Sequence, residues 1–329
     1  MSDHQLACGL PPGPDFADLA ALAESLGYAR VWIFESPALW EDPLIHLALA
    51  AERTSRIGLA TAVLIPQQRS LPAMASGLAT VARLAPGRLR ACFGTGFTAM
   101  VATGRTPMRL DALLDYVAAL RGLLAGETVR YEGRVLRMMH SPGLATERPI
   151  DVPLWLSVFG PRGQARAAEI AEGIIGPLHP TLPTATMVSG TVLEAGEDPQ
   201  SPRVREAVGP WRVVAWHGAW ARGGASAVDA MPGGAVWRAA LEGLAAEDER
   251  HLLAFEGHVT HLPSRDRGLL DQPQAGGAAR GELTGDAASV RAGVEALWKA
   301  GFREVIYTPS GPDVARELRA FAAAATDAS

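Results

Sequence analysis

Side chains able to do acid–base or binding chemistry follow several short apolar runs of this 329-residue chain. Glu35 comes directly after the apolar residues 31–34. Partial burial there can raise the pKa of the carboxyl, so that Glu35 orients a substrate or acts as an acid. A salt bridge or a contact with the start of a helix would explain the same residue. We expect Glu35 to act in a site or to hold the structure around one.

A second candidate is the run Gly94-Thr95-Gly96, which follows the apolar residues 89–93. Two of its three residues lack Cβ, so a flat ring system can approach the backbone there. Thr95 adds a hydroxyl that can bind a polar atom of the same molecule. A tight turn between a strand and a loop would need the same glycines, and this alternative stays open.

The run Phe159-Gly160-Pro161-Arg162-Gly163 has the composition of an anion site. It leads into an expected helix over residues 163–172, whose first N–H groups lack intrahelical partners and attract negative charge. Arg162 can add a charge-assisted hydrogen bond to a phosphate. The alternative is an ordinary Gly/Pro loop with a solvated arginine.

Four histidines, His217, His251, His258 and His261, lie close together in the sequence. Their spacings resemble no familiar set of metal ligands, so we expect no metal site and loop or surface positions for these side chains. His217 follows the apolar residues 212–216, an expected strand, and is therefore kept as a catalytic candidate. A serine nucleophile lacks support because no Gly-x-Ser-x-Gly elbow occurs.

Alternating strands and helices are needed to bring these segments together. Eight apolar runs are strand candidates: 5–9, 31–34, 57–64, 89–93, 154–158, 173–176, 212–216 and 304–307. Helical periodicity covers 15–26, 72–85, 109–124, 163–172, 287–300 and 312–325. The strand count favours an α/β fold of the (β/α)8 TIM-barrel type over a doubly wound open sheet. In such a barrel the reactive surface forms from the loops after the strands, where the candidates above lie.

Composition and charge narrow the class of protein. Hydrophobic residues make up 48% of the chain, which supports a large core, and we expect one domain over residues 1–329 with an irregular insertion at about 217–285. The net charge of -5 without a basic stripe argues against nucleic acid as a partner. No signal peptide or bilayer-spanning segment is evident, which predicts a cytoplasmic protein. Cys8 and Cys92 lie in strand candidates, where core packing is expected.

The ordered series of segments resembles the luciferase-like monooxygenase superfamily, particularly its branch that uses the deazaflavin coenzyme F420, such as methylenetetrahydromethanopterin reductase. The resemblance is carried by residues 20–34, 42–44, 54–66, 72–73, 87–96, 124–133, 152–161 and 171–173, and more loosely by 249–266 and 283–321. The chain departs from common family members after the second strand, where Glu35-Ser36-Pro37 stands in place of an Asp-His pair.

The resemblance implies a bacterial luciferase-like barrel that transfers hydride between F420 and a small organic substrate. It implies that the coenzyme lies against Val63 and Leu64 and is bound by Gly94, Thr95, Gly96, Ser157, Phe159, Gly160, Pro161, Arg162 and Gly163. Two alternatives remain: an FMN-dependent monooxygenase that uses externally reduced flavin, and a non-catalytic flavin-binding barrel. A homodimer is usual in the family and is expected here.

Overall fold

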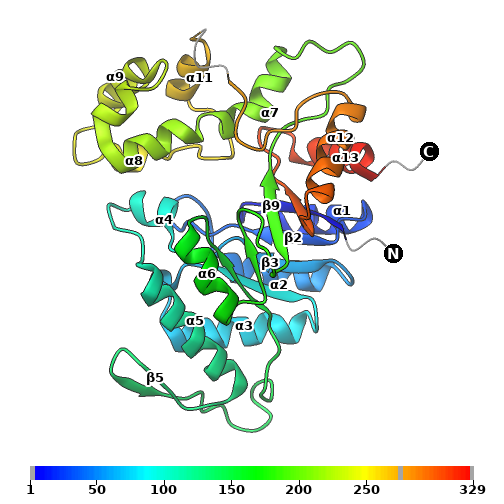
Figure 1. The fold of residues 1–329 in the computed structure, drawn as a ribbon, viewed down its shortest axis with the longest axis vertical. Helices are drawn as coiled ribbons and strands as arrows, with labels where there is room; N and C mark the ends of the chain where they lie inside the picture. The colour runs from blue at the N-terminus through cyan, green and yellow to red at the C-terminus, as the bar shows by residue number, and fades with distance from the viewer. Residues whose placement is uncertain (1–3, 273–276, 327–329) are drawn as a thin grey trace.

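Eight parallel strands close into a barrel in the computed structural model, which describes residues 4–272 and 277–326 (Figure 1). The strands follow one another around the barrel in chain order, and β10 closes on β1. They are β1 (Gln5–Leu10), β2 (Arg30–Ile33), β3 (Gly58–Thr61), β4 (Leu89–Phe93), β7 (Leu154–Ser157), β8 (Gly173–Ile175), β9 (Thr184–Val188) and β10 (Glu304–Tyr307). The predicted (β/α)8 TIM barrel of the α/β class is therefore confirmed.

Helices cover the outside of the barrel and connect most of its strands. They are α1 (Phe16–Ser25), α2 (Pro43–Arg53), α3 (Leu71–Leu84), α5 (Leu110–Ala125), α6 (Pro161–Ile170), α12 (Ala287–Lys299) and α13 (Val314–Thr326). An antiparallel ribbon of β5 (Val129–Tyr131) and β6 (Arg134–Leu136) lies between α5 and β7. Local sequence sets these bounds: Asp42 caps α2 by accepting from Leu44 N at 2.8 Å, and Pro43 occupies its first turn.

Inside the barrel, one layer of side chains takes one residue from each strand, and Glu304 lies next to it and accepts a hydrogen bond from Trp32 Nε1. The two tryptophans of this layer, Trp32 and Trp155, contact each other with ring centroids 5.8 Å apart. The layer consists of Ala7, Trp32, Ala60, Cys92, Trp155, Ile175, Ala185 and Ile306. Cys8 faces the outer core, and both cysteines are buried and free. Burial raises the pKa of both thiols, so their predicted role in packing is confirmed.

The seventh strand of the barrel is Thr184–Val188, and the prediction of a strand at 212–216 was wrong. The segment Thr184–Val188 contains two threonines, which suit a strand but interrupt the apolar pattern. Residues 212–216 belong to helices, because α7 (Pro202–Arg212) ends there and α8 (Val214–Asp229) begins. Val213 and Trp216 pack against Trp237 in a second hydrophobic core. A short apolar run fits the inner face of a helix as well as a strand.

The long connection between β9 and β10 is mostly helical, in contrast to the irregular insertion expected at about 217–285. It contains α7, α8, α9 (Gly234–Leu244), α10 (Arg250–Leu253) and α11 (Ser264–Leu270). Residues 273–276, part of the loop expected there, lie outside the described residues. Figure 1 shows α8, α9 and α11 grouped on the side of the barrel where α4 (Phe97–Val101) lies, and Ala102 after α4 joins their hydrophobic core.

Within 4–272 and 277–326, we find no helix that combines the length and the apolar character needed to cross a membrane.

Candidate functional site

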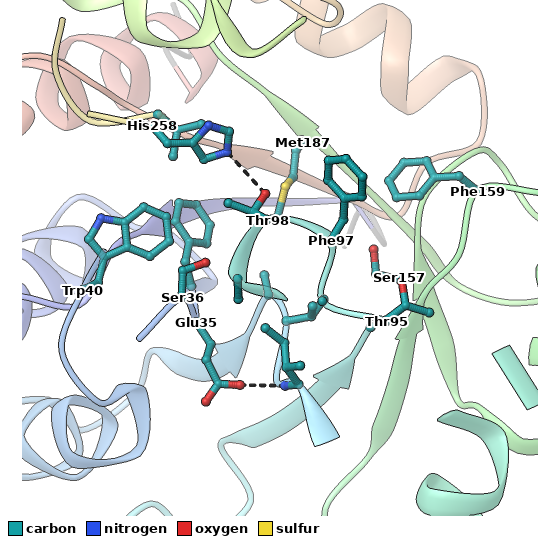
Figure 2. Close-up of a pocket in the computed structure, with 18 of the residues that line it drawn as sticks. Glu35, Ser36, Trp40, Thr95, Phe97, Thr98, Ser157, Phe159, Met187 and His258 are labelled. Carbon is teal, nitrogen blue, oxygen red and sulfur yellow. Dashed lines mark hydrogen bonds between the residues drawn. The ribbon is translucent and has the colours of Figure 1, made fainter. Parts of the chain in front are cut away.

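A cavity of about 300 Å³ opens at the ends of the barrel strands (Figure 2), which is within the size range of small-molecule sites. The loops after β2, β3, β4 and β7 supply most of its lining, and Met187 of β9 adds to it. The helical connection covers it with Trp211, His258 and Val259. Strands far apart in the sequence thus place their C-terminal ends around one space, as expected for a TIM barrel.

One wall of the cavity is apolar and comes from the loop after β3. Ala62, Val63 and Ile65 line it, and the peptide bond between Ala62 and Val63 is cis. Leu64, predicted beside Val63 as a coenzyme contact, instead packs in the core between barrel and helices and does not line the cavity. Successive side chains along an extended segment point to opposite sides, so Val63 and Leu64 do not share a face.

The run Gly94-Thr95-Gly96 lies in the cavity lining beside this wall. A Cβ on Gly94 would come within 2.6 Å of Val63 Cγ2, so the β4 loop packs on the wall only because position 94 is glycine. Gly96 adopts φ +78 and begins α4. The glycines are thus used both for a turn and for close packing, while their predicted contact with a coenzyme ring stays a prediction.

Glu35 lies at the cavity edge, but its carboxylate is already engaged. It accepts a hydrogen bond from Ile65 N at 2.6 Å and forms an ion pair with Arg69, which also binds Asp42 (Figure 2 shows the Ile65 bond). Burial raises the pKa of Glu35, and Arg69 opposes that rise. The salt bridge considered as the alternative to catalysis is present, and we assign Glu35 to positioning the wall at Ile65.

The segment after β7 contributes only its first part to the cavity. Ser157 and Phe159 line it, whereas the next four residues, Gly160, Pro161, Arg162 and Gly163, do not. Gly160 precedes α6, whose first N–H groups have no side-chain cap. These groups remain available to an anion at the rim.

Arg162 itself points to α5. Its Nη2 lies 2.8 and 2.9 Å from the two carboxylate oxygens of Asp111, and its side chain is 70% exposed. The guanidinium would have to leave Asp111 to reach a phosphate at the start of α6. The anion-binding role of Arg162 is therefore still a prediction, and the structure adds a competing partner to it.

His217 does not end a strand or line the cavity, contrary to the reason for which it was selected. It lies inside α8, completely buried, and binds Asp266 Oδ2 through Nε2 at 3.2 Å. The side chain that does reach the cavity is His258, which was expected in a loop or at the surface and is only 8% exposed. Its Nδ1 lies 3.0 Å from His217 Nδ1. The helical fold of residues 202–270 buries both rings.

The burial of His258 predicts a pH dependence of stability. Burial and the neighbouring His217 lower the pKa of His258 to about 3, from an ordinary value near 6.5. The unfolded chain therefore binds a proton that the folded chain does not, so stability is complete above pH 6.5 and falls as the pH drops below it. Between pH 7.5 and 5 we expect a loss of about 2 kcal/mol from this residue.

Urea unfolding at several pH values in this range gives the free energy of unfolding of wild type and of His258→Gln. The effect is the difference between the two slopes of that free energy against pH. Asp266, whose pKa is lowered mainly by its bond to His217 against the effect of burial, contributes only at more acidic pH. His261→Gln, an exposed neighbour, is the matched control and should keep the wild-type slope. Equal slopes for wild type and His258→Gln would contradict this prediction.

Several lining residues were not identified from the sequence. Trp40, Trp211 and Val259 have no motif around them and reach the cavity through a loop and the helical connection, and the lining also includes Phe97 and Thr98 of α4. Phe97 and Thr98 directly follow Gly96, so extending that motif by two residues would have found them. Nothing in the sequence indicates that residues 211 and 259 approach the barrel end.

The chain belongs to the luciferase-like monooxygenase family, which it matches over residues 3–304, so the predicted family is confirmed. It is 29% identical over 191 residues to a 5,10-methylenetetrahydromethanopterin reductase of Methanolobus tindarius, covering 56% of this chain and 57% of the relative. It is 32% identical over 172 residues to an F420-dependent glucose-6-phosphate dehydrogenase of Kineococcus radiotolerans, covering 48% and 51%. Their names agree with the predicted oxidoreductase class.

A solved structure of an F420-dependent secondary alcohol dehydrogenase in complex with an F420–acetone adduct has the same fold, with a TM-score of 0.67. The match covers 98% of this chain and 99% of that one, at 17% identity. The sequence matches to the two curated relatives named above are shorter. In each match the chain spans about half of the length of the relative.

Proposed function

We propose that this protein is an F420-dependent oxidoreductase that moves hydride between the deazaflavin and a small uncharged organic substrate. The observation that carries the proposal is the cavity at the strand ends. Its apolar wall, formed by Ala62, Val63 and Ile65, faces loops with hydroxyls and one imidazole. A ring system and a small substrate need such a combination of an apolar surface and a few polar groups. Family membership and the relatives' names support the coenzyme.

The residues present suit a deazaflavin in three respects. The wall at Val63 and the Gly94 loop packed against it offer an apolar surface to a ring. Ser157 offers a hydroxyl. The uncapped start of α6 and the exposed Arg162 lie next along the chain from the cavity lining at Phe159 and suit an anionic tail. When bound, the coenzyme supplies the carbon that accepts or donates hydride, and the protein supplies binding, orientation and electrostatics.

The lining of the cavity outside the apolar wall favours an uncharged substrate. Trp40, Phe97, Met187, Trp211 and Val259 give it an apolar surface. Within the described ranges, the lining contains no lysine or arginine, and its one acidic side chain is paired. A phosphorylated sugar, as named for one of the relatives, would find no cation there. We therefore propose a small alcohol or carbonyl compound as the substrate.

The purified protein should bind F420 more tightly than FMN. The deazaflavin carries carboxylates beyond its phosphodiester, and one extra charge-assisted hydrogen bond, worth about 1.5 kcal/mol, gives a preference of about tenfold. Quenching of the eight tryptophans, two of which line the cavity, follows both titrations at the same salt and pH. Tighter FMN binding would favour the monooxygenase alternative, and binding of neither would reject both coenzymes.

A further inference from the structure

Four side chains form an unbroken line of polar contacts from the cavity to a buried carboxylate. Thr98 Oγ1 lies 3.5 Å from His258 Nε2, and this contact is drawn in Figure 2. His258 Nδ1 lies 3.0 Å from His217 Nδ1, and His217 Nε2 lies 3.2 Å from Asp266 Oδ2. The four residues come from α4, the loop before α11, α8 and α11. Only the first two side chains line the cavity.

The donors and acceptors along this line can be assigned from Asp266. A carboxylate only accepts, so Nε2 of a neutral His217 carries its proton and Nδ1 is left as an acceptor. His258 must then donate from Nδ1, which leaves its Nε2 as a lone pair directed at Thr98 and the cavity. When His258 takes up a proton at Nε2, it can pass the proton on its Nδ1 to Nδ1 of His217. The line therefore has two proton arrangements, and His258 is neutral in both.

The surroundings stabilise a positive charge on His217 rather than on His258. Asp266 is fully buried and accepts at Oδ1 from Trp237 Nε1 at 2.7 Å and from Arg265 Nε at 3.0 Å. Arg265 also donates to the backbone carbonyl of Glu256 and lies 3.7 Å from its carboxylate. These contacts link Asp266, Arg265 and Glu256 to the two imidazoles as charged neighbours. The carboxylate in direct contact with His217 outweighs the guanidinium beyond it.

The loop that carries His258 is held in an unusual backbone conformation. Val259, the next residue, adopts φ +53, which is rare for a β-branched side chain. Such residues cost about 1–3 kcal/mol and are found mainly where function fixes the backbone. Gly311 N donates to the carbonyl of Thr260 at 2.8 Å and ties this loop to the chain after β10. This hydrogen bond connects the loop that carries His258 to the end of the barrel.

We propose that His258 is the catalytic acid–base group of the site and that His217 and Asp266 form its proton relay. This inference rests on the proposed function, because hydride transfer between a deazaflavin and an alcohol or ketone also moves one proton. The sequence pattern made His217 a catalytic candidate but assigned no role to His258 or Asp266. Glu35, the other titratable side chain at the cavity, uses its carboxylate to bind Ile65 and Arg69.

The step balances as follows in the direction of oxidation. The C–H bond of the alcohol breaks, and its hydrogen leaves with both electrons as hydride to the oxidised deazaflavin. The O–H bond breaks, the proton passes to His258 Nε2, and the C=O bond forms. The Nδ1 proton of His258 passes to Nδ1 of His217, which becomes an imidazolium beside the Asp266 carboxylate. Reduction of a ketone uses the same contacts in reverse.

Asp266→Asn tests the relay without coenzyme. Trp237 Nε1 and Arg265 Nε donate to Oδ1 at 2.7 and 3.0 Å, whereas Oδ2 accepts only a longer bond of 3.3 Å from Arg265 Nη2 beside His217. Oxygen is therefore favoured at the Oδ1 position, which places the new NH2 group toward His217 Nε2. His217 must then carry its proton on Nδ1 and His258 on Nε2. Nitrogen NMR of labelled histidines should show the Nδ1–H form of His258 in wild type and the Nε2–H form in the variant. An unchanged His258 form would overturn the proposed relay.

Kinetics with 2-propanol and acetone as probe substrates test the catalytic role. His258→Gln should lower kcat by about 100-fold or more while F420 affinity stays within twofold, since removing a general acid–base group typically costs that factor. Asp266→Asn should lower kcat less and shift its pH profile, which a merely structural role would not do. His261→Gln is the control, because its side chain is exposed and its imidazole contacts Thr260.

Wild-type kcat in His258→Gln would overturn the relay and leave the proposed function standing. Absence of turnover by the wild type, despite bound F420, would instead overturn the proposed function, and the NMR result would then decide the relay alone. Circular dichroism of each variant excludes unfolding as the cause. His217→Gln, in which the centre of the relay is removed, should reproduce the kinetic defect of Asp266→Asn, and a wild-type pH profile in it would count against the relay.

Discussion

Gly94→Val should weaken coenzyme binding on the order of 100-fold, since a displacement of about 1 Å in a binding geometry can have an effect of that size. Even a Cβ on residue 94 would lie 2.6 Å from Val63 Cγ2, and the branched side chain needs more space still. Either the β4 loop or the apolar wall must move, and both line the cavity. Titration of the variant with F420, followed by tryptophan fluorescence, measures the loss.

The matched control is Gly243→Ala. A Cβ at that position meets no atom within 4 Å, and the residue lies in α9, outside the cavity lining. Its coenzyme affinity should stay within about threefold of the wild type. Equal affinities of Gly94→Val and wild type, with both proteins folded, would show that the coenzyme does not lie against this wall.

Glu35→Gln should lower the free energy of unfolding by about 3 kcal/mol, the lower end of the cost of removing one partner of a buried ion pair. The Glu35 side chain is 1% exposed and that of Arg69 15%, so water replaces little of the lost interaction. The lower end applies because Asp42 still pairs with Arg69. Urea unfolding at pH 7.5 measures the change.

Asp18→Asn is the control for this variant. It removes an ion pair with Arg53 in which both side chains are more than 60% exposed, and such pairs contribute at most about 1 kcal/mol. A similar loss in both variants would mean that the charge of Glu35 is not responsible. Glu35→Gln should also loosen the wall at Ile65 and weaken coenzyme binding, whereas a fully retained affinity would remove Glu35 from the positioning role.

The fold was largely predictable because seven of its eight barrel strands are apolar runs followed by turn residues. The one wrong strand shows the limit of that signal. Thr184–Val188 is not an apolar run, yet its position between β8 and β10 buries it. Residues 212–216 are apolar because they pack inside the helical connection. Hydrophobicity indicates that a segment is buried. The segments packed around it decide whether it forms a strand or part of a helix.

The sequence by itself determined the barrel and the part of the site that follows the strands, because local periodicity and glycine spacing are properties of the chain. The family followed from the resemblance of the ordered segments. Val63, Gly94, Thr95, Ser157 and Phe159 are brought together at the cavity in this way. Only the tertiary structure decided where the long β9–β10 connection folds. It placed His258 at the cavity and His217 behind it, next to Asp266. Contacts between distant helices depend on packing that no local pattern encodes, and the acid–base chemistry proposed here depends on those contacts.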